Sequence, residues 1–149
     1  MASTLYSADC AAGSGVQPRT GLALCSVSGS YTFLAALVDE DVIQMVKIPA
    51  GATILDWILD IPATGLDTGT AIVFDLGDAG STGRFATGCV QGRSSAGAIV
   101  RPGSAGSVVG GTQYAYTAED TIDFHVTTAP TTGVAEGTMK LTVFYTMDL

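Results

Sequence analysis

The chain is poor in basic residues. Six Lys and Arg stand against 14 Asp and Glu in 149 residues, which gives a formal net charge of −8. Proteins that bind nucleic acids rely on Lys and Arg to neutralise phosphates, and anionic membrane surfaces attract basic segments in the same way. The composition therefore argues against a nucleic-acid-binding protein and against a protein that docks on an anionic membrane.

Histidine and cysteine are also scarce. His125 is the only histidine, and the three cysteines, Cys10, Cys25 and Cys89, form no CxxC pair. A structural zinc site needs about four Cys or His ligands, so we expect no metal and no other cofactor. An odd number of cysteines without such pairing favours thiols in a chain that folds in a reducing cytoplasm over a disulfide framework.

Long hydrophobic runs are missing as well. No apolar stretch approaches the roughly 18 residues of a membrane span. The N-terminal stretch MASTLYSADCAAGSG has neither the basic region nor the apolar core of a secretory signal. We therefore expect neither a transmembrane segment nor a signal peptide.

Alternating apolar and polar residues are what the sequence has instead. The alternation is clear over 52–61, 70–76, 120–127 and 138–147. Runs that are apolar on both faces cover 20–27, 31–38 and 42–48, and weaker runs lie near 97–101 and 111–117. Short strands separated by glycine-rich turns predict an all-β protein, an antiparallel β-sandwich of jelly-roll type.

The segment 52–61 carries the only tryptophan. Strict alternation places one set of side chains on its inward face, namely Thr53, Leu55, Trp57, Leu59 and Ile61. Trp57 is therefore interpreted as part of the core and not as a platform for a sugar. Cys25 and Cys89 bracket Trp57 as in an immunoglobulin domain, but the spacing does not fit that fold.

Two segments do not have the pattern of strands. Residues 1–19 are small and polar and predict a flexible arm that precedes a single sandwich domain, residues 20–149. Residues 77–111 are predicted to form a long Gly/Ser-rich loop, and loops of this length are usually functional or disordered.

The predicted loop also has a charge bias. No acidic residue occurs from Ala79 to Ala118, whereas Arg84, Arg93 and Arg101 all lie there. We interpret the loop as a docking surface for an acidic protein, because Arg is favoured at interfaces and pairs with carboxylates. The alternative is that the three arginines only keep a surface loop soluble.

The stretch DLGDAGSTGRF (75–85) has the composition of an active-site loop. The positions after Asp75 that bind calcium in an EF-hand hold Gly77 and Ala79, and no GxxxxGK[ST] phosphate-binding string occurs. The simpler interpretation is that the two aspartates end a strand and make a turn. Calcium held by Asp75, Asp78 and a distant acid remains the alternative.

Catalytic candidates are few. His125 lies on the polar face of its predicted strand, and no nucleophile-elbow pattern accompanies it. Asp56 and Asp60 share one strand face, which indicates exposure more than the paired carboxylates of a glycosidase. We therefore expect no catalytic residues and no enzyme.

Two stretches resemble the small structural proteins of tailed bacteriophages. The first is VKIPAGATILDWILDIPATGLDTGTAIVFDLGDAGSTGRF (46–85), with an IPAGA turn, LDTGTA, and LGD followed by RF. The second is AEDTIDFHVTTAPTTGVAEGTMKLTVFYTMD (118–148), and together they cover about half of the chain. Such proteins are similar to capsid decoration, or cement, proteins, several of which are jelly rolls that assemble as dimers or trimers at capsid symmetry axes.

The resemblance implies a virion structural protein that is made in the host cytoplasm and binds the outer surface of the assembled capsid. The implied partner is the major capsid protein, and the implied state is a homo-oligomer, a dimer or a trimer. We place the contacts on the arm and on the arginine-rich loop, at Arg19, Arg84, Phe85, Arg93 and Arg101. The alternative is a tail or head-fibre component that recognises host glycans, for which Tyr114 and Tyr116 are the only close aromatic pair.

Overall fold

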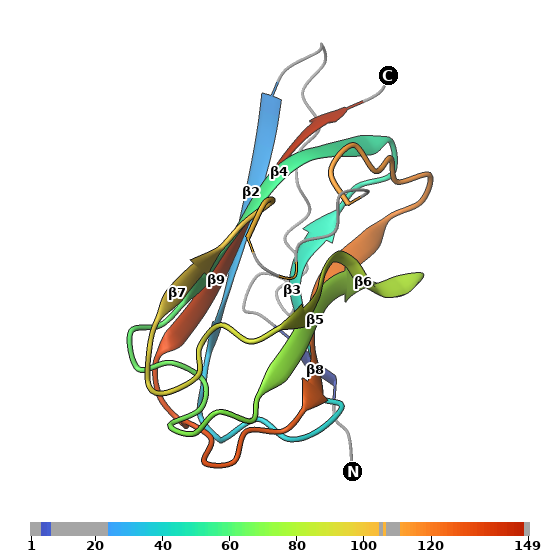
Figure 1. Cartoon of the computed structure of the whole chain (residues 1–149). Coiled ribbons are helices and arrows are strands. Elements are labelled where there is room, and N and C mark those ends of the chain that lie inside the picture. Colours follow the sequence, from blue (N-terminus) through green and yellow to red (C-terminus); the bar gives the residue numbers. More distant parts are fainter. Residues whose placement is uncertain (1–3, 7–23, 105, 107–110, 148–149) are drawn as a thin grey trace.

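A computed structural model describes residues 4–6, 24–104, 106 and 111–147, and these residues form two packed β-sheets (Figure 1). One sheet has five strands in the order β1-β3-β8-β5-β6, and the other has four in the order β2-β9-β4-β7. The strands are β1 Thr4–Tyr6, β2 Leu24–Thr32, β3 Val42–Ile48, β4 Ala52–Ile61, β5 Val73–Asp78, β6 Ser81–Cys89, β7 Ala98–Val100, β8 Asp120–Thr128 and β9 Thr138–Met147.

The predicted antiparallel β-sandwich is confirmed. Every paired neighbour in the two sheets is antiparallel except β1 and β3, which run parallel. The jelly-roll type remains a prediction, and the expected boundary between residues 19 and 20 lies outside the described residues. The described part of the chain contains no helix long and apolar enough to span a membrane.

The core lies between the two sheets and follows the predicted alternation. On β8 and β9 every second side chain is buried, namely Ile122, Phe124, Val126, Met139, Leu141, Val143, Tyr145 and Met147. Phe124 stacks on Phe74 of β5 with ring centroids 4.5 Å apart. Trp57 is 1% exposed, so its interpretation as a core residue is confirmed. Each such large side chain contributes about 1.5–3 kcal/mol through burial.

For the first half of β4, the prediction of which side chains face the core is wrong. A register shift between Ile54 and Asp56 marks a β-bulge in the pairing with β9. Because a bulge adds one residue, the alternation changes phase there. Ile54 is therefore buried and Leu55 is 42% exposed, whereas Leu59 and Ile61 keep their predicted places in the core.

Two predicted segments differ from the structure. The run 31–38 is not a strand of its own, because β2 extends only to Thr32 and the chain then bends away. Phe33 and Leu37 still reach the core, while Leu34 is 87% exposed. An apolar run therefore does not by itself show that residues 31–38 form a strand.

The predicted long loop 77–111 is also wrong in large part. It contains β6, which pairs with β5, and β7, which pairs with β4. β6 consists mostly of small residues and lacks the alternation of large apolar side chains that indicates a strand. Its ladder needs only backbone groups, and its apolar contribution comes from three buried side chains, Phe85, Ala86 and Cys89.

The two sheets approach each other closely where β2 passes β3. Gly29 of β2 lies against the backbone of Met45, and β3 has a register shift between Gln44 and Val46 at this point. A Cβ atom at Gly29 would overlap the Met45 carbonyl oxygen and lie 2.9 Å from the carbonyl carbon. Only glycine fits such a close approach of two backbones.

The face of β8 that points away from the core carries two partly buried polar side chains. Asp123 Oδ1 and His125 Nδ1 are buried and have no hydrogen-bond partner among the described residues. Burial raises the pKa of Asp123 to about 6. The hydrogen bond from Thr121 opposes this shift, and the charges of Asp120 and Asp78 reinforce it.

We predict that Asp123→Asn stabilises the protein at pH 7.5 and not at pH 3. The folded-state pKa lies above the unfolded value of about 3.9, so ionisation of Asp123 favours unfolding. Wild-type stability should fall as the pH rises through about 6. With a discount for partial exposure, we expect a gain of about 1 kcal/mol in urea unfolding at pH 7.5. Asp60→Asn, at an exposed acid of β4, is the control for net charge, and an equal gain there would refute the explanation by burial.

Candidate functional site

The stretch 75–85 is a β-hairpin, formed by the end of β5 and the start of β6. Asp78 Oδ1 accepts hydrogen bonds from the backbone N–H groups of Gly80 (3.0 Å) and Ser81 (2.9 Å). Asp75 Oδ1 accepts one from the N–H of Gly88 at 2.8 Å. The interpretation of Asp78 as a turn residue is confirmed, whereas the expectation that Asp75 ends its strand is wrong, because Asp75 lies inside β5 (Val73–Asp78).

Asp78 is also the centre of a polar network. It is 3% exposed, and Arg84 donates to both of its oxygens through Nε and Nη2. The Tyr116 hydroxyl donates to Oδ2 at 2.8 Å. Burial alone would raise the pKa of Asp78, but the hydrogen bonds and charge of Arg84 and the bond from Tyr116 hold it below its usual value. Asp78 is thus an ionised carboxylate in a bidentate pair.

This network uses both Asp78 oxygens, so Asp78 has no free oxygen for the calcium ion considered above. Among the described residues, no group of three or more His, Cys, Asp or Glu is placed to hold a metal ion.

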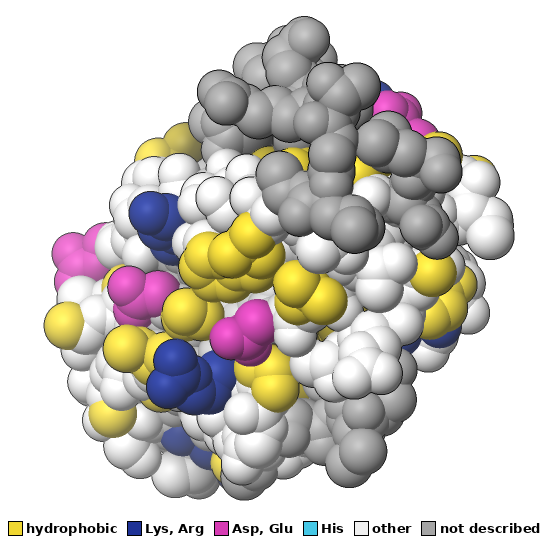
Figure 2. Space-filling model, turned by 90° about the horizontal axis from the view of Figure 1, so that it is seen from above, with side chains coloured by type: hydrophobic (Ala, Val, Ile, Leu, Met, Phe, Trp, Pro, Cys, Tyr) yellow, Lys and Arg dark blue, Asp and Glu magenta, His cyan; other side chains and the backbone are white. Residues whose placement is uncertain are grey.

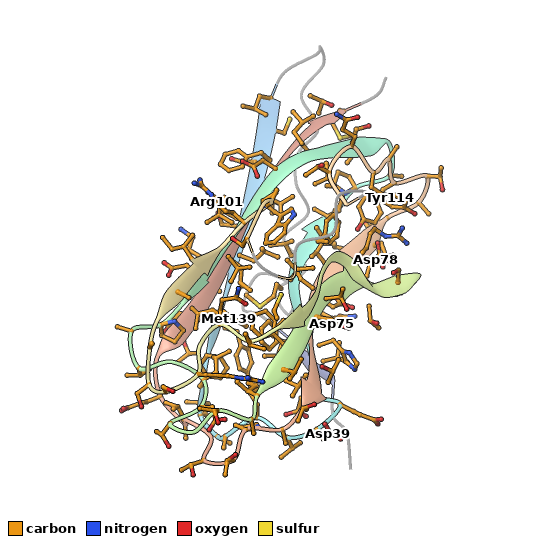
Figure 3. All side chains as sticks on the ribbon, in the orientation of Figure 1. Asp39, Asp75, Asp78, Arg101, Tyr114 and Met139 are labelled. Carbon is orange, nitrogen blue, oxygen red and sulfur yellow. The ribbon has the colours of Figure 1, made fainter. Side chains whose placement is uncertain are left out.

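The tyrosines at 114 and 116 complete the network. The Arg84 guanidinium lies over the Tyr114 ring, 3.8 Å from its centroid, and the Tyr114 and Tyr116 rings meet edge to face at 5.0 Å. Figure 3 shows Tyr114 and Asp78 beside the hairpin. Tyr116 is 4% exposed, and one face of Tyr114 is covered by Arg84. The pair is therefore not an open stacking surface for a sugar.

The predicted contact residues do not form one surface. Phe85 is fully buried and meets Trp57 in the core, with ring centroids 6.5 Å apart. Arg93 is half-buried and donates to the backbone carbonyls of Ile72 (2.8 Å) and Ala71 (3.2 Å). Arg101 follows β7 and is exposed. Arg19 lies outside the described residues. The roles of Arg84, Phe85 and Arg93 within the chain are structural, and sequence alone gave no signal for them.

Cys89 and His125 are the described residues of most interest as a nucleophile and a base. Burial, reinforced by the charge of Asp75, raises the pKa of the Cys89 thiol to about 11, so the reactive thiolate is scarce at neutral pH. His125 faces Asp75 and Val42 on the neighbouring strands. The strand pairing places neither a serine nor a cysteine directly opposite this histidine.

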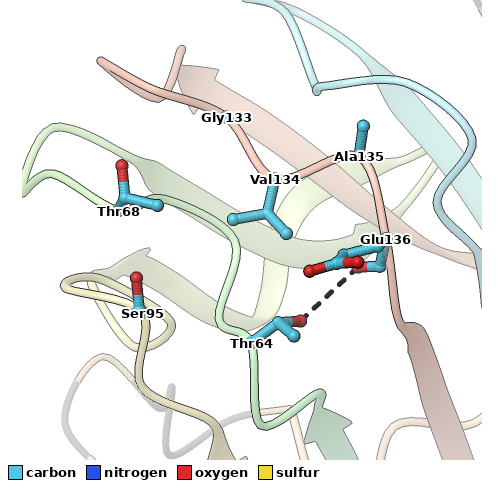
Figure 4. A pocket seen from close by; sticks show the side chains of 7 residues that line it. All are labelled: Thr64, Thr68, Ser95, Gly133, Val134, Ala135 and Glu136. Carbon is cyan, nitrogen blue, oxygen red and sulfur yellow. Dashed lines mark hydrogen bonds between the residues drawn. The ribbon is translucent and has the colours of Figure 1, made fainter.

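A shallow groove of about 490 Å³ lies among the loops that join the strands (Figure 4). Its lining residues are Thr64, Thr68, Ser95, Gly133, Val134, Ala135 and Glu136. Thr64 Oγ1 donates to the backbone carbonyl of Glu136 at 3.5 Å. The lining contains hydroxyl groups and one carboxylate but neither an aromatic ring nor a histidine, so it offers polar contacts and no stacking platform.

Asp67 fixes the loops around this groove. It is fully buried and accepts five backbone N–H bonds, from Gly69, Ala71, Ile72, Thr131 and Thr132, at 2.8–3.2 Å. Burial opposes ionisation, but these bonds outweigh it and hold the pKa of Asp67 far below its usual range. Sequence analysis missed this residue, although Asp followed two positions later by Gly is a recognised turn signal.

Hydrophobic side chains are also found on the surface. In the view of Figure 2 they gather between acidic and basic side chains. The large exposed ones are Leu24, Leu34, Val38, Leu55, Val90 and Ile99, and Leu34 and Leu24 are 87% and 65% exposed. Single exposed apolar residues are ordinary on a protein surface, so these six identify surfaces available for contact without defining one site.

The chain matches no protein-family model and no curated protein. Its fold is similar to that of chains in solved phage capsids. A chain in the capsid of Ralstonia phage GP4 is 21% identical, with a TM-score of 0.80 over 99% of both chains. A chain in the capsid of cyanophage Pam1 is 21% identical, with a TM-score of 0.67 over 91% of this chain and 92% of that one. A chain in the acid-stable capsid of Helicobacter pylori bacteriophage KHP30 is 16% identical, with a TM-score of 0.54 over 83% and 87%. The β-sandwich is thus a fold that this chain shares, over nearly all its length, with chains of phage capsids.

Proposed function

We propose that this protein is a virion structural protein that binds the outer surface of an assembled phage capsid and stabilises it. The observation that carries the proposal is the likeness to a chain of the GP4 capsid over 99% of both chains. The stretches 46–85 and 118–148 support it independently, because their sequence motifs resemble those of small structural proteins of tailed bacteriophages.

The proposed mechanism is thermodynamic. A protein that binds the assembled lattice and not the free subunits shifts the equilibrium towards the lattice by mass action. Many copies that each bridge neighbouring major capsid proteins add up, even where one contact is modest, because the attachment is multivalent. A dimer or trimer of this chain would increase that multivalency.

Arg101 and the N-terminal arm with Arg19 are the proposed contacts. Arg101 is exposed, and it follows the short edge strand β7, where Ile99 is 63% exposed. An arginine beside an apolar side chain is typical of protein interfaces, where Arg is enriched and Lys is depleted. Arg84 and Arg93 bind groups of their own chain, so we expect them to support the fold.

Co-sedimentation with purified, undecorated capsids tests the proposed function. We expect saturable binding with a fixed number of copies per capsid and a rise in the capsid's melting temperature. Binding to host cells or to their oligosaccharides, with none to capsids, would favour the fibre alternative and refute the proposal.

We predict that Arg101→Ala weakens capsid binding about fivefold to tenfold, or roughly 1 kcal/mol, without lowering the melting temperature of the free protein. Lys140→Ala is the matched control, because it removes one exposed positive charge from β9. Equal losses of affinity would indicate a general charge effect. An unchanged affinity in Arg101→Ala would remove this residue from the contact surface.

A further inference from the structure

The first strand is attached to the edge of the sandwich. Among the described residues, β1 comprises Thr4–Tyr6 and pairs in parallel with β3, with Thr4 opposite Val42, Leu5 opposite Ile43 and Tyr6 opposite Gln44. By contrast, β2 and β9 are joined by nine antiparallel residue pairs. Parallel pairing is also slightly less stable per residue than antiparallel pairing. Among the described residues, the β1–β3 ladder is therefore weaker than the β2–β9 ladder.

The site that β1 occupies is an open sheet edge. β3 pairs with β8 on one side and with β1 on the other. Without β1, the backbone groups on this side of β3 would be left without a strand partner, and such an edge is a template for another chain. On its other side, β3 has a register shift with β8 between Gln44 and Val46, directly after the last residue that pairs with β1. The acceptor is thus a defined segment, Val42–Gln44.

The connection from β1 to the rest of the fold is long enough to reach a second molecule. Residues 7–23 separate Tyr6 from Leu24, and a segment of this length can span up to about 60 Å. A compact domain of this size has a radius of gyration of about 15 Å. The connection is rich in small residues and contains no run of bulky apolar side chains.

We propose that β1 is exchanged between copies of this chain, so that Thr4–Tyr6 of one copy pairs with Val42–Gln44 of its neighbour in the homo-oligomer. Every copy carries the same donor and the same acceptor, so the exchanged strand makes the same hydrogen bonds as the unexchanged one. Pairing within one chain has the advantage of a millimolar effective concentration. Copies that are held side by side on a lattice also have a high effective concentration for one another, which offsets this advantage. In this respect the inference rests on the proposed function.

Disulfide trapping between two differently tagged chains tests the exchange. One chain carries Thr4→Cys and the other Val42→Cys, which are register partners. Paired strands lie about 4.8 Å apart, within the Cα–Cα range of a disulfide. After co-expression and oxidation, peptide mapping identifies the 4–42 link. If neighbours mix at random, we expect about half of the Thr4→Cys chains to be joined to a Val42→Cys chain.

Three controls make the result decisive. The wild type reports links through Cys10, Cys25 and Cys89, and a Lys140→Cys acceptor on the other sheet should form no link. The double variant Thr4→Cys/Val42→Cys reports the geometry within one chain. A 4–42 link that forms only inside single chains would overturn the exchange, and a double variant that forms no link at all would refute the β1–β3 pairing on which it depends.

Capsid co-sedimentation of the tagged chains separates this inference from the proposed function. Linked oligomers that do not bind capsids would refute the capsid role and leave the exchange standing. Chains that bind capsids without any 4–42 link between copies would refute the exchange alone.

Discussion

Replacing Gly29 by alanine is expected to lower the free energy of unfolding by about 3 kcal/mol or more. The added methyl group would overlap the Met45 carbonyl oxygen and lie 3.0 Å from Val46 Cγ1. The obstructing atoms of Met45 belong to the backbone of β3, whose residues on either side, Gln44 and Val46, pair with β8, so they cannot rotate away as a side chain could. The two sheets would have to separate where β2 passes β3. Urea unfolding followed by circular dichroism measures the loss.

Gly88→Ala is the matched control for this substitution. Gly88 lies on β6 with a φ of +63°, and no atom lies within 4 Å of the position of an added Cβ. Its replacement should cost only the strain of a left-handed residue, about 1–2 kcal/mol. If Gly29→Ala were no more destabilising than Gly88→Ala, the close approach of β2 and β3 would be refuted.

Asp67→Ala is expected to destabilise the protein by about 3–5 kcal/mol. The substitution removes the acceptor of five backbone N–H groups in the loops 69–72 and 131–132, and leaves buried donors without partners. Asp39→Ala, at an exposed acid in the turn before β3, is the control and should change stability by less than about 0.5 kcal/mol. A similar small change at Asp67 would contradict the role assigned to its hydrogen bonds.

Asp67 also gives acid sensitivity. Its folded-state pKa is depressed, so its stabilising contribution is complete above the unfolded value of about 3.9 and is lost progressively as the pH falls below that value. The wild type should lose stability more steeply on acidification than Asp67→Ala. If the urea midpoints of the wild type and of Asp67→Ala fell equally between pH 5 and pH 2.5, this assignment would be contradicted.

Most of the fold could be predicted from the sequence because the strongest strands alternate cleanly. β8 and β9 each bury one face, and a period of two places their side chains without further information. β4 shows the limit of that reasoning. A bulge depends on the register with a neighbouring strand, so nothing in the residues 52–61 alone indicates that Leu55 leaves the core.

The partners of the arginines within the chain were less predictable, because composition does not show where a side chain is directed. The acid-free segment 79–118 predicts that Arg84 and Arg93 are docking groups. Arg84, however, binds Asp78, which lies just before that segment, and Arg93 binds backbone carbonyls more than twenty positions earlier. Phe85 follows Arg84 in sequence and points to the opposite face of the strand, into the core. Charge counted along a chain thus does not distinguish an interface arginine from a structural one.

A cryo-EM map of the intact phage particle is the most direct test of the proposed function. We predict density for this β-sandwich on the outer surface of the capsid shell, in many symmetry-related copies, with Arg101 facing the major capsid protein. Density for the sandwich only in the tail or in fibres, or a shell without it, would contradict the proposal.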